Sequence, residues 1–149
     1  MIARVFVDTN VLVYPYDRAS PEKQRAARIL LAQLVKARAG VISAQVLAEF
    51  FTTVTRKLKA PISLDRAERR VINLGRTMDV VPTTNLIVQE AIRGTQQYHF
   101  QFWDAMIWAA ARLNHAPLIL SEDFQDGALI EGVRIKNPFA EKFRLEDLL

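Results

Sequence analysis

The chain has 149 residues, half of them hydrophobic and 24% charged, with a net charge of +4, which suits a single domain over residues 1–149 with a sizeable core. It contains no cysteine, which excludes disulfides, thiol catalysis and cysteine-ligated zinc sites. Met1 leads directly into an apolar strand without a signal-peptide pattern, and no apolar run is long enough to cross a membrane, so we expect a cytoplasmic protein.

Short apolar runs alternate with amphipathic stretches along the chain. Strands are predicted at residues 2–7, 41–43, 78–82, 117–123 and 132–138, and helices at 21–38, 44–59, 63–74, 84–98 and 102–114. Helix N-caps are expected at Ser20, Ser43, Ser63 and either Thr83 or Thr84. Strands that alternate with helices imply an α/β fold, in which helices cover both faces of a small, mostly parallel sheet of about five strands.

Carboxylates follow two of the predicted strands. Asp8 comes directly after the first strand, and Asp123 lies at the end of the fourth. Because ligands of open parallel sheets bind outside the carboxyl ends of the strands, we expect both acids at one edge of the sheet. Glu49 and Asp104 are predicted on helices, each as an isolated acid among apolar neighbours.

Four carboxylates in apolar surroundings form a coherent set if they share a divalent cation. Without a cation they would repel one another, and burying a carboxylate costs several kcal/mol unless it is paired or metal-bound. Oxygen ligands of this kind suit Mg²⁺ or Mn²⁺, ions that activate water and stabilise phosphodiester cleavage. The sequence therefore predicts a Mg²⁺ or Mn²⁺ site.

Competing kinds of site lack their motifs. There is no GxxxxGK[ST] phosphate loop, no GxGxxG after a strand, and no GxSxG nucleophile turn. His99 and His115 are the only histidines, and we interpret both as surface or core-edge residues. Phosphatases of the haloacid dehalogenase type also place an Asp after the first strand, but they need a second Asp where this chain has Asn10.

Positive charge is concentrated in the first half of the chain. Residues 1–76 contain 14 Lys and Arg against 6 Asp and Glu, a net +8, whereas residues 77–149 contain 6 against 10, a net −4. A basic half either attracts a polyanion such as RNA or consists of solvated helix faces. The same two interpretations apply to the arginines predicted along one side of a helix, Arg66, Arg69 and Arg70.

Four stretches of the chain each contain one of the candidate acids: "VFVDTNVLVY" (5–14), "ISAQVLAEF" (42–50), "QFWDAMIWAAA" (101–111) and "LILSEDF" (118–124). Together, in order and approximate spacing, they resemble the acidic motifs of PIN-domain ribonucleases. The resemblance extends from Ile2 to about Phe139. Within the family, the chain looks like a VapC-type toxin of a type II toxin–antitoxin pair. The resemblance implies a PIN-like three-layer α/β/α sandwich and Mg²⁺- or Mn²⁺-dependent cleavage of RNA. It also implies a cognate antitoxin and a homodimer.

The resemblance also implies roles for individual residues. Asp8, Glu49, Asp104 and Asp123 would be the catalytic and metal-site acids, with Asp126 as a further acid near a second metal. Thr9, Asn10, Ser43 and Ser121 would support them. Glu122 precedes Asp123 directly, and because neighbouring residues of a strand face opposite sides, only one of the two can point into the site. The motif favours Asp123.

Structural interpretations stand beside these roles. Asp8 could accept hydrogen bonds in a turn, and Asp104 could be the N-cap of its helix. Phe100, Phe102, Trp103 and Trp108 could stack on bases, although their helical spacing favours core or dimer packing. The alternatives for the whole chain are another metal-dependent phosphohydrolase, or a non-enzymatic module of the same fold that binds RNA or protein.

Overall fold

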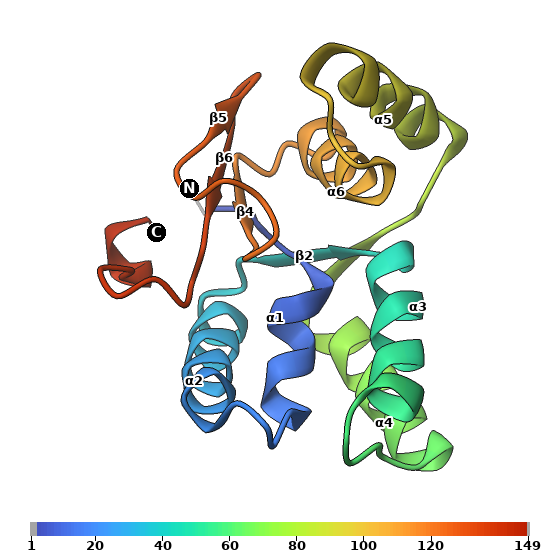
Figure 1. Cartoon of the computed structure of the whole chain (residues 1–149), viewed down its shortest axis with the longest axis vertical. Coiled ribbons are helices and arrows are strands. Elements are labelled where there is room, and N and C mark those ends of the chain that lie inside the picture. Colours follow the sequence, from blue (N-terminus) through green and yellow to red (C-terminus); the bar gives the residue numbers. More distant parts are fainter. Residues whose placement is uncertain (1–2, 149) are drawn as a thin grey trace.

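A six-stranded sheet forms the centre of the molecule (Figure 1). The computed structural model describes residues 3–148, so Ile2 of the predicted first strand lies outside them. The strands are β1 (Val5–Val7), β2 (Gly40–Ser43), β3 (Asp79–Val81), β4 (Leu118–Leu120), β5 (Leu129–Ile130) and β6 (Val133–Lys136). Their order is β3-β2-β1-β4-β6-β5, and every pair is parallel except β5 with β6. The mostly parallel sheet is confirmed.

Helices cover both faces of the sheet (Figure 1). On one side lie α1 (Thr9–Val13), α2 (Pro21–Ala37), α3 (Ala44–Thr52) and α4 (Leu64–Thr77), and on the other lie α5 (Asn85–Tyr98) and α6 (Phe102–Leu113). Short turns complete the chain: η1 (Tyr14–Tyr16), the π-type turn η2 (Thr53–Lys57) and η3 (Leu145–Asp147). This arrangement confirms the predicted three-layer sandwich.

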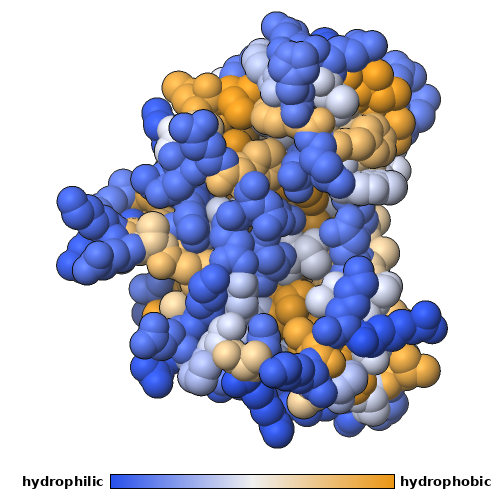
Figure 2. Space-filling model, in the orientation of Figure 1, coloured by the Kyte–Doolittle hydropathy of each residue, from blue (hydrophilic) through white to orange (hydrophobic). Residues whose placement is uncertain are grey.

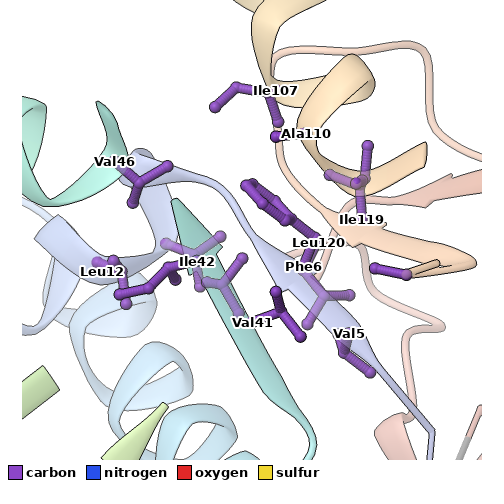
Figure 3. Close-up of a cluster of buried hydrophobic side chains, with 14 of the residues drawn as sticks. Val5, Phe6, Leu12, Val41, Ile42, Val46, Ile107, Ala110, Ile119 and Leu120 are labelled. Carbon is purple, nitrogen blue, oxygen red and sulfur yellow. The ribbon is translucent and has the colours of Figure 1, made fainter. Parts of the chain in front are cut away.

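The core is built on the two central strands, which are buried on both faces. Figure 3 shows Phe6 of β1 near Ile107 and Ala110 of α6, while Ile42 of β2 lies on the side of α1 and α3. All four side chains are 2% exposed or less. Burial on both faces explains why these strands are continuous apolar runs rather than alternating ones.

Register brings the ends of β1 and β4 to the same edge. Val7 pairs with Leu120, and the Asp8 amide donates to the Leu120 carbonyl at 3.0 Å. Asp8 and Ser121 are therefore the first residues beyond two neighbouring strands. The sheet positions them together, as the sequence predicts.

Among the α-helices and strands, two short elements were not predicted. The sequence "TNVLV" after Asp8 is the helix α1, and "LI" at 129–130 is the antiparallel strand β5. A two-residue turn joins β5 to β6, with φ of 48° at Glu131 and 83° at Gly132. Positive φ at both positions is what a tight hairpin turn requires.

Several boundaries also differ from the prediction. The fourth strand ends at Leu120 rather than 123, because the Ser121 hydroxyl accepts from the Asp123 amide at 3.1 Å and turns the chain. The second predicted helix ends at Thr52 and continues as the π-type turn η2, where the Thr55 hydroxyl donates to the Phe51 carbonyl at 2.7 Å. Ser20 precedes α2 without a side-chain cap, whereas Ser43 and Ser63 cap their helices as predicted. Of the two candidates Thr83 and Thr84, the structure has Thr84 as the cap of α5.

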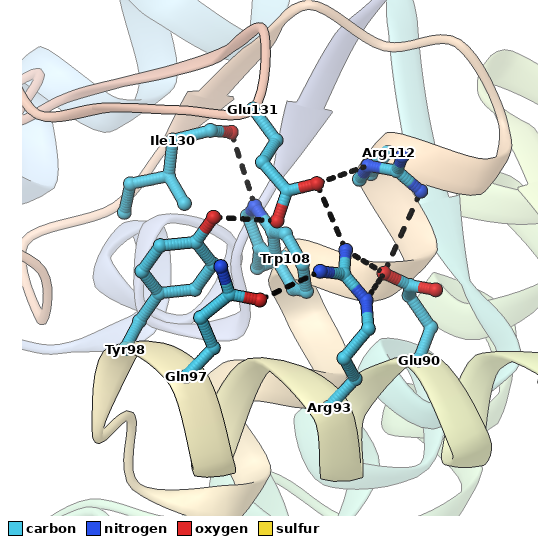
Figure 4. Close-up of polar contacts among 8 residues, drawn as sticks. All are labelled: Glu90, Arg93, Gln97, Tyr98, Trp108, Arg112, Ile130 and Glu131. Atoms are coloured by element: carbon cyan, nitrogen blue, oxygen red, sulfur yellow. Dashed lines mark hydrogen bonds and ion pairs between the residues drawn. The ribbon is translucent and has the colours of Figure 1, made fainter.

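A polar network fastens the β5–β6 hairpin to α5 and α6 (Figure 4). The Glu131 carboxylate accepts from Arg93 at 2.9 Å and from the Tyr98 hydroxyl at 2.6 Å. Arg93 and Arg112 also pair with Glu90. The Trp108 indole of α6 donates to the Ile130 carbonyl of β5 at 3.2 Å, which holds the hairpin against α6.

Most of the face in Figure 2 is hydrophilic, with smaller apolar patches towards the α5–α6 end and over the region of α3 and α4. Among residues 3–148, no helix is both long enough and apolar enough to span a bilayer.

The two tryptophans differ in burial. Trp108 is fully buried, as core packing predicts, whereas Trp103 is 55% exposed.

Candidate active site

Asp8 is the most buried acid of the site, with 4% of its surface exposed. It is the N-cap of α1, and its carboxylate accepts from the Thr9 amide at 2.7 Å and from the Ser121 hydroxyl at 2.6 Å. Burial raises the pKa of Asp8 to about 7, although these hydrogen bonds lower it. The nearby charges of Asp123 and Asp104 raise it further. The carboxylate is thus held where its negative charge is poorly solvated.

Asn10 connects Asp8 to Asp123. Its side-chain amide donates to Asp123 Oδ2 at 3.0 Å, and at 3.4 Å to Asp8 Oδ2 and to the Ser121 hydroxyl. The first acidic motif, "DTN", therefore contacts the last one, "SED". Residues that are 113 positions apart in the sequence become neighbours at the sheet edge.

Glu122 points away from the other acids. Its carboxylate accepts from the Tyr14 hydroxyl and pairs with Lys23 at 2.9 Å. Its neighbour Asp123 faces Asn10 instead. Of the two adjacent acids, the structure thus directs Asp123 toward Asp8, the orientation that the motif favours.

Glu49 approaches the same edge from α3. Its Oε2 accepts from the Thr9 hydroxyl at 3.0 Å, and its Oε1 accepts from the Gln45 amide at 2.8 Å. Both carboxylate oxygens are therefore oriented by neighbours. Thr9 links Glu49 to Asp8, because its backbone amide and its hydroxyl each bind one of the two acids.

Asp104 comes from the other side of the sheet, in the first turn of α6. It is not the N-cap, because Gln101 holds that position and accepts from the Asp104 amide at 3.2 Å. Partial burial raises the pKa of Asp104, and the charges of Asp123 and Glu49 raise it further. Asp104 thus interacts electrostatically with acids from both halves of the chain.

Two predicted site residues, Asp126 and Ser43, accept hydrogen bonds from backbone amides, and within residues 3–148 neither forms a hydrogen bond with the other candidate acids. Asp126 Oδ1 accepts from the Asn137 backbone amide at 2.8 Å, which secures the segment before the β5–β6 hairpin. The buried Ser43 hydroxyl accepts from the Val46 amide at 3.3 Å as the cap of α3. Ser43 therefore positions the helix that carries Glu49.

Sequence reasoning predicted Thr9, Asn10 and Ser121 beside the acids but missed further residues that position the acids. Gln45 lies four positions before Glu49 and Gln101 lies three before Asp104, so both are neighbours across one helical turn. That spacing could have identified them. The contact of Glu122 with Tyr14 and Lys23 joins segments about a hundred residues apart, and no local pattern indicates it.

The chemistry of the site fits a hard divalent cation. The four acids offer only oxygen atoms, and Asn10 Oδ1 is buried without a hydrogen-bond partner among the residues that the structure describes. In this arrangement the Asn10 amide bridges Asp8 and Asp123. Within the described residues 3–148, no three acidic or histidine side chains are gathered closely enough to chelate an ion as they stand. The fit therefore rests on donor chemistry and on the poorly solvated charge of Asp8.

Comparisons with known proteins agree with this architecture. A toxin–antitoxin complex from Klebsiella pneumoniae has a TM-score of 0.65 and 21% identity, covering 92% of this chain and 98% of that one. The Mycobacterium tuberculosis toxin VapC20, which cleaves the sarcin–ricin loop, has a TM-score of 0.65 and 22% identity, and the match covers 85% of this chain and 97% of that one. VapBC2 of Rickettsia felis, bound to promoter DNA, has a TM-score of 0.62 and 16% identity, and the match covers 89% of this chain and 97% of that one.

These likenesses show a shared fold. Among curated proteins, no sequence matches this chain. The PIN domain family, in contrast, matches residues 5–125, a range that spans β1 to the segment after β4 and contains Asp8, Glu49, Asp104 and Asp123. The match also separates the chain from phosphatases of the haloacid dehalogenase type. The chain belongs to the PIN domain family.

Proposed function

We propose that the chain is a metal-dependent endoribonuclease that hydrolyses RNA phosphodiester bonds. The observation that carries this proposal is that four carboxylates from four segments of a PIN-family chain approach one edge of the sheet, close enough for their charges to interact. A cluster of this kind costs free energy in the folded protein, because its charges repel one another and Asp8 is buried. A bound cation would offset that cost and give the cluster a function.

Asp8, Glu49, Asp104 and Asp123 are the residues proposed to hold Mg²⁺ or Mn²⁺. Such an ion, when bound, supplies an activated water and stabilises the charge that develops on the phosphate. The chain's own part is to orient the acids. Thr9 and Ser121 fix the Asp8 carboxylate, and Gln45 fixes that of Glu49. Asp126 is not included, because its carboxylate binds the Asn137 amide.

The structural neighbours support a biological setting. Similar structures include a toxin–antitoxin complex and a toxin that cleaves the sarcin–ricin loop of RNA. We extend the proposal to a cytoplasmic VapC-like toxin that acts as a homodimer and is neutralised by a cognate antitoxin covering the acids. An endoribonuclease without such a partner would damage the RNA of its own cell.

The proposal is tested by cleavage of total RNA with purified protein in Mg²⁺ or Mn²⁺. We expect discrete fragments that disappear with EDTA and fall by about 100-fold or more in Asp104→Asn, since even outer-shell changes at metal sites cost 10–100-fold. Asp147→Asn is the matched control, because Asp147 is exposed and lies in η3, remote in sequence from all four motifs. It should cleave like the wild type.

Equal cleavage by Asp104→Asn and the wild type would contradict the assignment of the site. If folded protein free of antitoxin cleaves no RNA and calorimetry detects no Mg²⁺ or Mn²⁺ binding, the chain is instead a non-enzymatic binding module with the same fold.

A further inference from the structure

A second feature of the molecule is a cavity of about 490 Å³ at the far end of α1 from Asp8. Its walls come from η1, the start of α2, the segment 60–62 and the first turns of α4. Four arginines line it: Arg18, Arg28, Arg66 and Arg70. Tyr16 and Pro61 add flat apolar surface. We call this cavity the arginine pocket.

The charge of the arginine pocket is not neutralised by the protein. None of its lining residues is acidic. In the part of the chain that the structure describes, none of the four arginines forms an ion pair, although Arg69 on the same helix pairs with Asp65 at 3.1 Å. Grouping like charges in this way costs free energy unless an anion accompanies them.

The pocket walls are fastened by hydrogen bonds. Arg28 and the Gln24 side chain each donate to the Pro15 carbonyl at 2.9 Å, which ties α2 to η1. The Ser63 hydroxyl accepts from the Arg66 amide at 3.1 Å and starts the helix that carries Arg66 and Arg70. Arg28, Arg66 and Arg70 therefore project from anchored backbone, which lowers the entropy lost when they bind a ligand.

We propose that the arginine pocket binds a backbone phosphate of the RNA strand, away from the bond that is cut. The proposal rests on the proposed function, because the same strand would pass from the pocket to the acids. A planar guanidinium matches two phosphate oxygens, and a volume of about 490 Å³ is in the range of pockets that hold a small organic ligand such as one nucleotide. The exposed part of Tyr16 offers a ring on which a base can stack.

The position of the pocket suits this role. Asp8 and Tyr16 stand at opposite ends of the continuous helical segment α1–η1, eight residues apart, or about 12 Å at the helical rise. That length corresponds to roughly three or four nucleotides of a stacked strand. Without their cation the acids repel RNA, so positive groups elsewhere help to hold a strand over them, and this pocket supplies four.

The test is RNA binding without cleavage. The affinity for a fluorescent single-stranded RNA of about 20 nucleotides, longer than the sites of most single folds, is measured by anisotropy in EDTA. In the double variant Arg66→Ala/Arg70→Ala, we expect the affinity to fall about tenfold or more. The slope of log K against log salt should become shallower by about 0.7, the value for one lost phosphate contact on a single strand.

Arg69→Ala is the matched control. It removes one positive charge from the same helix, half of the charge that the double variant removes, but Arg69 pairs with Asp65 and does not line the pocket. It should change affinity and slope by much less than half of the change in the double variant. Circular dichroism melts check that all variants fold, and a variant that does not fold is replaced by Arg18→Ala, which lies outside the helices.

Unchanged binding by the folded double variant, or an equal loss in Arg69→Ala, would overturn the inference. So would displacement of the RNA by polyglutamate more readily than by unlabelled RNA, since the pocket would then favour an acidic peptide. The readout separates this inference from the proposed function. If the protein binds RNA through the pocket but does not cleave it, only the proposed function is contradicted. If it cleaves RNA and the double variant binds RNA as the wild type does, only the pocket inference is contradicted.

Discussion

Asp8 is the residue at which burial and charge conflict most strongly. Its raised pKa means that, in metal-free protein, the folded state holds a proton more tightly than the unfolded state does. The contribution of Asp8 to the free energy of unfolding is therefore greatest below its ordinary pKa of 3.8. It falls as pH rises from about 4 through about 7. At pH 8, metal-free Asp8→Asn should melt at a higher temperature than the wild type, because it removes an ionised buried carboxylate.

A divalent cation should reverse that order. An ion that binds only the folded wild type stabilises it by about 2.7 kcal/mol when the free ion is at roughly 100 times its Kd. We expect Mg²⁺ or Mn²⁺ to raise the melting temperature of the wild type and to leave that of Asp8→Asn unchanged. The measurement is a thermal melt with and without EDTA, and equal shifts in both proteins would contradict a role for Asp8 in metal binding.

The sequence could identify the acids but not the way each one points. Asp8 was identifiable because a carboxylate directly after a buried strand needs a special reason to be there. The choice between Glu122 and Asp123 depended on the motif alone, since both follow the same strand. In the structure, Tyr14 and Lys23 bind the Glu122 carboxylate from a distant part of the chain, so Asp123 is the acid that points toward Asp8.

At the scale of elements, the packing of α5 on α6 depends on one glycine. A Cβ at Gly94 would lie 2.7 Å from Trp108 Cζ3 and 3.0 Å from Cε3, and Trp108 is fully buried. Gly94→Ala should therefore destabilise the protein by about 1–3 kcal/mol in urea denaturation, despite the better helix propensity of alanine. A stabilised Gly94→Ala would show that the two helices can separate.

Gly75 in α4 is the matched control, because a Cβ there meets nothing within 4 Å. Gly75→Ala should stabilise the protein by about 0.5–1 kcal/mol, as expected for a glycine in an exposed helix.

The elements divide into those with local signals and those without. The caps at Ser43, Ser63 and Thr84 were predictable because each hydroxyl binds an amide three residues later. The helix α1 has only five residues, too few for its periodicity to be recognised. The strand β5 has two, and it depends on the Glu131–Gly132 turn and on contacts with α5 and α6.

On the scale of the whole molecule, the Glu131 network joins the sheet edge to the α5–α6 layer. The hydrogen bonds from Arg93 and Tyr98 lower the pKa of Glu131 below its ordinary 4.5. Its contribution to stability is therefore full above pH 4.5 and is lost as pH falls through the lowered value. Glu131→Gln should be less stable than the wild type near neutral pH, and the difference should shrink on acidification.

Urea denaturation at about pH 7 and about pH 3 measures this effect. Glu146→Gln is the control, because Glu146 is exposed and its only ion pair within residues 3–148, with Arg144, is 4.0 Å long. It should show no such pH dependence, and a constant difference between Glu131→Gln and the wild type would contradict the assignment.

The strand order has a consequence for synthesis of the protein. Asp8 and Glu49 belong to the part of the chain that is made first, whereas Asp104 and Asp123 follow about a hundred residues after Asp8. Strand β1 pairs with β2 on one side and with β4 on the other. Because β4 is made late, the sheet edge at which the acids lie is incomplete until residue 123 has left the ribosome. A nascent chain therefore carries only half of the proposed catalytic acids. An enzyme that attacks RNA would in this way be inert while it is still attached to the RNA-rich machine that makes it.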